Sequence, residues 1–230
     1  GSSDTTPLFV MLLAELRRWD AGSDVVERLL PHADRAIEWI EQFGDLDGDG
    51  YVEYRRRSEH GLDNQGWKDS WDAVRHADGE LAQPPIALCE VQGYVYAAYL
   101  ARAELARDAG DTATYRRCLE RARELRRRFN DDFWLDELGT FALALDADKR
   151  PVRAVASNVG HCLWAGIVDE ERAALVADRL LDETMFSGWG VRTLAASMRA
   201  YNPVSYHNGS VWPHDNALAA AGLVRDGVVE

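Results

Sequence analysis

Cysteine and long apolar runs are both scarce in this sequence. Its 230 residues include only three cysteines, Cys89, Cys118 and Cys162, which lie far apart and form neither a CxxC pair nor an even disulfide framework. We interpret them as buried thiols and expect a reduced, cytoplasmic setting. No stretch approaches the roughly 18 apolar residues of a membrane span. The apolar run at residues 8–14 lacks a basic leader, which argues against a signal peptide.

Positive charge is scarce as well. Lysine and arginine together number 26 against 39 acidic residues, which gives a net charge of −13, and lysine occurs only at Lys68 and Lys149. A field of this sign repels polyanions, so nucleic acid is excluded as a partner, whereas neutral ligands remain open. The composition, 47% apolar and 28% charged, is typical of a globular protein. No Gly/Ser-rich linker divides the chain, and we predict a single domain over residues 1–230.

Helical periodicity dominates the sequence and predicts an all-α fold of about eight helices. Residues 86–108 are apolar nearly all round, as in a helix enclosed on most sides, whereas residues 112–129 carry one apolar stripe opposite Arg and Glu. This alternation predicts a two-layer α/α toroid with inner and outer helices. A complete six-hairpin (α/α)6 barrel has twelve helices, so we expect a partial toroid, truncated at both ends. Further helices are predicted over 7–19, 24–43, 158–165, 169–183 and 211–224.

Three long connections separate these helices, at residues 44–83, 131–157 and 184–210. Loops of this length in a helical protein tend to carry function. Within them, residues 51–54 and 140–145 have the composition of short strands. The first loop opens with the D-x-D-x-D-G pattern of a calcium loop at residues 45–50, but its twelfth position is Arg56, where such a loop needs a bidentate Glu. We favour a tight acidic turn, with a weak calcium site as the alternative.

The segment 59–72 combines four carboxylates, two tryptophans, an amide pair and Lys68. Aromatic faces stack on sugar rings while carboxylates and amides bind hydroxyls, so this composition favours a carbohydrate site. A carboxyl group against Trp67 is also in the environment that keeps a general acid protonated. Lys68 would oppose that effect if it pointed toward Asp69. The alternative is a solvated acidic loop with two anchoring tryptophans.

Two further features belong to this hypothesis. Glu90 lies inside the apolar run 86–108, where a lone carboxylate is costly, so it either faces a cavity mouth or pairs with an arginine. Residues 206–216 gather aromatic, amide, imidazole and hydroxyl groups before a helix that can begin at Pro213. His207 and His214 lack a third ligand at zinc spacing, and we expect neither a metal nor a cofactor.

Five segments together resemble the bacterial amylo-α-1,6-glucosidases, which are glycogen-debranching-type glycoside hydrolases. These segments span nearly the whole chain, and those at 64–70 and 207–214 are the most specific. The resemblance implies an α/α toroid that hydrolyses α-glucans with inversion, using two carboxylates. The segments are Asp-Thr-Thr-Pro-Leu-Phe (4–9), Asn-Gln-Gly-Trp-Lys-Asp-Ser (64–70), Glu-Val-Gln-Gly-Tyr (90–94), Phe-Ala-Leu-Ala-Leu-Asp (141–146) and His-Asn-Gly-Ser-Val-Trp-Pro-His (207–214).

The resemblance also implies roles for single residues. Asp69, in Trp-x-Asp, is the favoured general acid, and Asp63, in Gly-x-Asp-Asn, is the alternative. The general base of such enzymes is a Glu beyond the helix that Trp212 and Pro213 open, which places it after residue 230. We therefore predict that this chain alone is inactive. The expected substrate-binding residues are Asp4, Asn64, Gln65, Trp67, Lys68, Glu90, His207, Asn208 and Trp212.

Two other readings of the same site stay open. A trehalase-like or mannosylglycerate-type hydrolase could use the same toroid with different subsite loops, and a substrate panel would separate them. A non-catalytic glucan-binding module could use the same aromatic cleft without the second carboxylate. The sequence predicts no oligomeric state.

Overall fold

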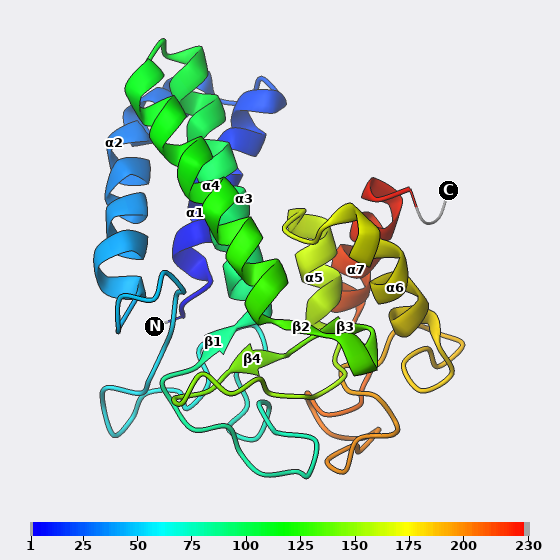
Figure 1. The fold of residues 1–230 in the computed structure, drawn as a ribbon. Helices are drawn as coiled ribbons and strands as arrows, with labels where there is room; N and C mark the ends of the chain where they lie inside the picture. Colours follow the sequence, from blue (N-terminus) through cyan, green and yellow to red (C-terminus); the bar gives the residue numbers. More distant parts are fainter. Residues whose placement is uncertain (1, 228–230) are drawn as a thin grey trace.

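The computed structural model describes residues 2–227, and within that range it contains seven α-helices joined by long loops (Figure 1). The predicted all-α class is confirmed, with seven helices where about eight were expected. At most of the helix ends, the predicted bounds differ from the observed ones by a few residues. The helices are α1 Thr5–Arg18, α2 Ser23–Trp39, α3 Cys89–Asp108, α4 Thr112–Asp132, α5 Asn158–Ala165, α6 Glu170–Leu181 and α7 Pro213–Arg225.

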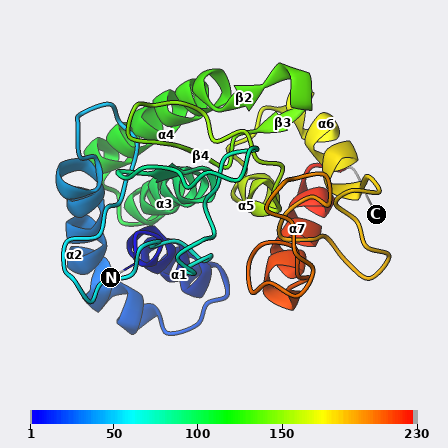
Figure 2. The same cartoon turned by 90° about the horizontal axis from the view of Figure 1, so that it is seen from below.

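The helices form two layers. In the inner layer α1 packs on α3, α3 on α5 and α5 on α7, while α2, α4 and α6 pack on the outer sides of α1, α3 and α5. The patterning explains the difference between the layers: α3 is buried along most of its length, whereas α4 buries one stripe that includes Cys118, Leu125 and Phe129. Seen from below, the helices follow an open arc (Figure 2). The predicted partial α/α toroid is therefore confirmed.

Four very short strands brace the loops. Strand β1 (Ala87–Leu88) pairs antiparallel with β4 (Ala144–Leu145), and β2 (Trp134–Leu135) with β3 (Thr140–Phe141). The strand expected over 140–145 is thus two strands, because Leu143 turns to a different partner and accepts from the Cys89 amide. The helix expected from residue 86 begins at Cys89, because the backbone of β1 pairs with β4. The strand expected over 51–54 is reduced to an isolated bridge between residues 54 and 86.

All three long loops lie at one end of the helices, which we call the loop end (Figure 1). The inner helices α1, α3, α5 and α7 direct their N-termini toward this end, so their partial positive charge faces the loops. One exception to the predicted helix lengths is α2, which ends at Trp39 and continues as a single π-helical turn, Ile40–Gly44. None of the described helices is both long and apolar enough to cross a bilayer.

Candidate active site

Trp67 is the centre of an aromatic cluster at the loop end. Its indole ring stacks on His161 of α5, with ring centroids 5.4 Å apart and planes inclined by 20°. Its ring also meets three others nearly edge to face: His207 at 5.4 Å, Trp212 at 6.2 Å and His214 at 5.8 Å. The structure therefore brings together the first loop, the last loop, α5 and the residue before α7, and with them the predicted substrate-binding residues Trp67, His207 and Trp212.

A buried chain of hydrogen bonds supports this cluster from below. Tyr94 Oη lies 2.5 Å from His161 Nδ1, and His161 Nε2 lies 2.9 Å from Asp215 Oδ1. Burial raises the pKa of the Tyr94 hydroxyl well above its usual value, so Tyr94 keeps its proton and donates to Nδ1. At Nε2 the same ring faces the Asp215 carboxylate. All three side chains are buried.

Sequence reasoning missed both His161 and Asp215. His161 lies in a short, mostly apolar segment with no motif around it. Asp215 lies inside the segment 206–216, and its position in the first turn of a helix was the available signal. Polar side chains in mostly apolar helices need partners when they are buried, and this need could have indicated that the two meet.

Lys68 points into the protein and not toward solvent. Its ammonium group is buried and donates to the backbone oxygen of Thr193 at 2.5 Å, and it lies 5.2 Å from the centre of the Trp67 ring. Burial lowers the pKa of Lys68 to about 8, against the opposing charges of Asp215 and Glu90. The direction of this side chain, which sequence left open, is therefore inward.

The two candidate acids lie in different surroundings. Asp69 is exposed and makes no hydrogen bond or ion pair with residues 2–227. Asp63 is also exposed, but an oxygen of its carboxylate lies 2.6 Å from Arg56. The neighbouring Gly61 and Leu62 line a separate cavity of about 480 Å³ beside the N-terminal segment. Both assignments stay predictions, and Asp69 has the free carboxylate beside the aromatic cluster.

Glu90 occupies the first turn of α3 and has no exposed surface. Burial raises the pKa of its carboxyl group, while the nearby side chains of Asn158, His161 and Lys68 act in the opposite direction. Within the described part of the chain no arginine pairs with Glu90, which removes the salt-bridge interpretation. Gly66 is required beside it, because a Cβ at that position would lie 2.4 Å from Leu88 and 3.1 Å from Glu90 Oε1.

Asn64 is held within the first loop. Its Oδ1 accepts from the Tyr54 hydroxyl at 2.7 Å, and its Nδ2 donates to the Ser70 carbonyl at 2.7 Å. The Gln65 amide donates to the Arg55 carbonyl at 3.4 Å. These contacts shape the loop that carries Trp67 and Asp69, and a direct sugar contact from Asn64 or Gln65 stays a prediction.

Two side-chain pairs join the first loop to the last one. Ser70 Oγ lies 2.6 Å from His207 Nδ1, and Asn208 Nδ2 donates to a carboxylate oxygen of Asp72 at 3.0 Å. A cavity of about 510 Å³ lies beside the second pair, lined by residues of both loops that include Arg75, Asp72 and Asn208. Polar side chains of opposite loops thus face one open space at the loop end.

Asp4 lies on the α1 side of the same region. Its carboxylate accepts hydrogen bonds from the hydroxyls of Ser2 and Thr5. Its negative charge also reaches Tyr94 and His214, where it acts to raise both pKa values. The structure therefore places Asp4 near the cluster, and its contact with a sugar hydroxyl stays a prediction.

His207 gives the site an expected pH dependence. Burial and the Lys68 ammonium lower the pKa of His207 to about 4, against the charges of Asp69 and Asp72. In the unfolded chain the histidine pKa is about 6.5, so between pH 6.5 and 4 the unfolded chain binds more protons at this position. The stability that neutral His207 contributes is therefore fully present above pH 6.5 and is lost as the pH falls toward 4.

His207→Gln tests this dependence, because glutamine does not titrate yet can still pair with Ser70. We expect its free energy of unfolding to fall less than that of the wild type between pH 6.5 and 4, as measured by urea denaturation at several pH values. Equal slopes for the two proteins would contradict the assigned pKa.

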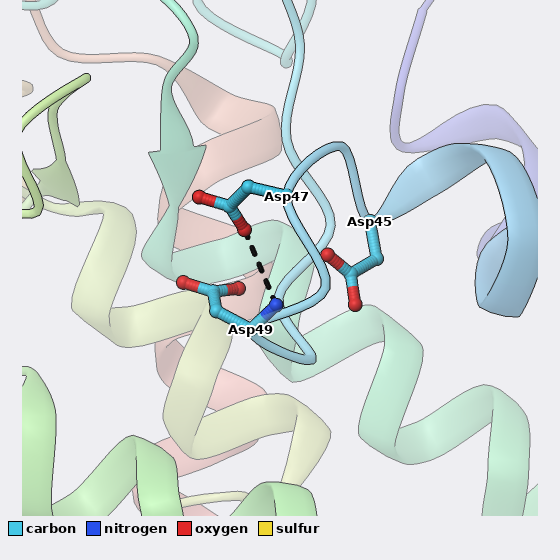
Figure 3. A group of neighbouring side chains, drawn as sticks. All are labelled: Asp45, Asp47 and Asp49. Atoms are coloured by element: carbon cyan, nitrogen blue, oxygen red, sulfur yellow. Dashed lines mark hydrogen bonds between the residues drawn. The ribbon is translucent and has the colours of Figure 1, made fainter.

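The acidic turn at residues 45–50 is closed by a lysine. Figure 3 shows Asp45, Asp47 and Asp49 close together, and their oxygens lie within 4.8 Å of one another. Asp45 accepts from two backbone amides of the turn at 2.7 and 2.8 Å. The Lys149 ammonium lies 2.8 Å from Asp47 and 2.6 Å from Asp49, and it also pairs with the buried Glu53. An ammonium group thus occupies the position where a cation would bind, which favours the acidic-turn interpretation.

The loop end of this α/α toroid thus combines the aromatic cluster around Trp67 with the exposed carboxylate of Asp69. The chain belongs to the mannosylglycerate hydrolase MGH1-like glycoside hydrolase domain family, whose model matches residues 2–230. The predicted resemblance to α/α-toroid glycosidases is therefore confirmed at the level of the family. The amylo-α-1,6-glucosidase specificity stays a prediction. No curated protein matches the chain.

Solved structures agree with this fold at low sequence identity. The GH63 mannosylglycerate hydrolase from Thermus thermophilus, in complex with Tris, is 16% identical; the match covers 99% of this chain and 66% of that one, with a TM-score of 0.74. A sialidase is 15% identical over 88% of this chain and 18% of its own, with a TM-score of 0.70. Neutral trehalase Nth1 from Saccharomyces cerevisiae is 18% identical, and the match covers 69% of this chain and 31% of that one, with a TM-score of 0.55. The chain therefore spans less than two thirds of the length of these proteins.

Proposed function

We propose that this chain is the acid-bearing part of an inverting glycoside hydrolase. The observation that carries the proposal is the position of Asp69: an exposed carboxylate without a partner among the described residues, two residues after the tryptophan at the centre of the loop-end cluster. A free carboxylate beside aromatic rings matches the chemistry of glycoside cleavage, in which a carboxyl group protonates the leaving oxygen of a sugar.

The mechanism divides between two carboxyl groups. Asp69 protonates the glycosidic oxygen, and a second carboxylate activates a water on the opposite face of the sugar ring, at a separation of roughly 6.5–9.5 Å. We assign the second role to a Glu, which the resemblance places beyond the helix that Trp212 and Pro213 open. Asp63 is the alternative acid, and its ion pair with Arg56 makes it the weaker candidate.

The remaining groups at the loop end hold the sugar. The partly exposed rings of Trp67 and Trp212 offer apolar faces for stacking, and His207 and Asn208 bring polar groups from the last loop. Two further aromatic side chains of these loops, Trp71 and Tyr206, are each 62% exposed and would extend the stacking surface.

Two substrate classes are supported by different observations. The segments 64–70 and 207–214 support an α-glucan substrate, with removal of a glucosyl residue at an α-1,6 branch. The family match, and the likeness to a protein described as a mannosylglycerate hydrolase, support a mannosylglycerate-type substrate. Both substrates present a hexosyl ring to the same cluster, and they differ in the hexose, glucose or mannose, and in the leaving group.

A substrate panel with stereochemical readout tests the proposal. A protein that carries the whole barrel would be incubated with an α-1,6-branched glucan, mannosylglycerate and trehalose, and the first-formed anomer would be followed by proton NMR. We expect hydrolysis of one of the first two substrates, with release of the inverted anomer. Retention of configuration, or no hydrolysis of any substrate, would overturn the proposal.

A further inference from the structure

Lys68 is an unusual residue to find buried in this protein. It is one of only two lysines, and its ammonium group is enclosed where the first and last loops meet. Its hydrogen bond to the Thr193 carbonyl joins positions that are 125 residues apart. Within residues 2–227 no carboxylate lies within 4.0 Å of the ammonium nitrogen, so Lys68 is not held by a direct ion pair.

Two fully buried carboxylates face Lys68 from different helices. Asp215 approaches from α7 and Glu90 from α3, and each has no exposed surface. Asp215 Oδ2 and Glu90 Oε1 accept no hydrogen bond from the described residues. Because charges interact strongly where water is excluded, these two carboxylates act on the ammonium over more than contact distance. The other titratable groups that face Lys68 are Cys89 and His207.

The anchoring of Lys68 determines how its neighbours are presented. Trp67 is stacked on His161 by one face, Lys68 is bonded to Thr193 in the interior, and Asp69 is left exposed. The inward lysine thus fixes the backbone immediately before the proposed acid. His161, which stacks on Trp67, also lies 2.9 Å from Asp215. The Asp215 carboxylate therefore contacts the aromatic cluster and also faces the buried Lys68 ammonium.

We propose that Lys68 is the positioning residue of this site and that Asp215 and Glu90 are the buried counter-charges that keep it protonated. The buried ammonium holds the segment 67–69 against the last loop, and Asp69 is thereby directed outward. The catalytic consequence of this arrangement rests on the proposed function, whereas the charge arrangement itself can be measured without activity.

The small number of lysines makes a direct measurement practical. With lysine labelled at the ε-carbon, the NMR spectrum of this chain contains two side-chain signals. Lys149 serves as an internal reference, because its three carboxylate partners raise its pKa above the ordinary lysine value. We expect the Lys68 signal to titrate near pH 8 in the wild type. A Lys68 that titrates near about 10.5, the value of an exposed lysine, would overturn the proposal.

Removal of each counter-charge tests its contribution. In Asp215→Asn the midpoint of Lys68 is expected to move by about one pH unit or more toward acid, roughly a tenfold loss of proton affinity, and Glu90→Gln is expected to move it in the same direction. Asp34→Asn removes the same charge from α2, where Asp34 pairs with Arg102, and serves as the matched control with no expected shift. If Asp215→Asn does not fold, Glu90→Gln decides. An unchanged midpoint in every folded counter-charge variant would overturn the assignment.

The catalytic consequence is tested in a protein that carries the whole barrel. Lys68→Met is expected to lower kcat about 100-fold or more with KM changed less than about threefold, because the acid is misdirected while the sugar-binding rings remain. A normal kcat in Lys68→Met would overturn the positioning role. An inactive wild type would instead contradict the proposed function and leave the NMR result standing.

Discussion

Asp69→Asn is expected to lower kcat about 1,000-fold in a protein that carries the whole barrel. The amide is close to the carboxyl group in size but cannot donate a proton to the glycosidic oxygen, and general acid catalysis contributes about 100- to 10,000-fold. KM should change little, because Asp69 is exposed and makes no contact with the described residues that the substitution would break. Steady-state kinetics on the substrate identified by the panel would measure both constants.

Two controls make this result specific to the acid role. Asp63→Asn removes the other candidate, whose carboxylate pairs with Arg56 at the surface, and its kcat is expected to stay within about threefold of the wild type. A glycosyl fluoride needs little protonation of its leaving group, so Asp69→Asn should lose far less activity on that substrate. The reverse pattern, with the large loss in Asp63→Asn, would move the acid role to Asp63.

The sequence predicted the fold because the difference between inner and outer helices is local. The apolar enclosure of α3 and the single stripe of α4 are visible in composition and spacing alone, and the alternation leads directly to the toroid. Helix ends were harder to predict. The first residues of the run 86–108 are apolar and suited to a helix, yet their backbone pairs with β4, and only the distant partner strand decides this.

Local sequence signals also indicated part of the chemistry of the candidate site. Clustering of tryptophan and carboxylate in segment 59–72 is a local signal that indicated a carbohydrate site, and the resemblance to debranching glucosidases then selected Asp69 within it. The direction of Lys68 depends on a carbonyl group 125 residues away, and the closure of the acidic turn depends on Lys149, which lies 96 residues after Glu53. Spacing along the chain contains no information about such pairs, so His161, Asp215 and the lysine contacts required the folded structure.

Gly222→Val is expected to destabilise the protein by about 3 kcal/mol, because it forces two inner helices apart. A Cβ at Gly222 of α7 would lie 2.6 Å from the backbone nitrogen of Trp164 and 2.7 Å from the Leu163 side chain of α5. On the same pair of helices, a Cβ at Gly160 would lie 2.7 Å from Ala219. The backbones of α5 and α7 are therefore so close that only glycine fits at these two positions. A branched side chain cannot enter without moving one of the helices.

The same close approach sets the distance between His161 on α5 and Asp215 on α7. Separation of the helices should therefore break their 2.9 Å contact and shift the Lys68 midpoint, in addition to lowering the free energy of unfolding in urea. Ala220→Val is the matched control: it places the same side chain at an exposed position of α7 and should cost only about 0.5 kcal/mol, from lower helix propensity. If Gly222→Val proves as stable as Ala220→Val, the glycine contact does not position the two helices, and the buried pair must depend on other packing.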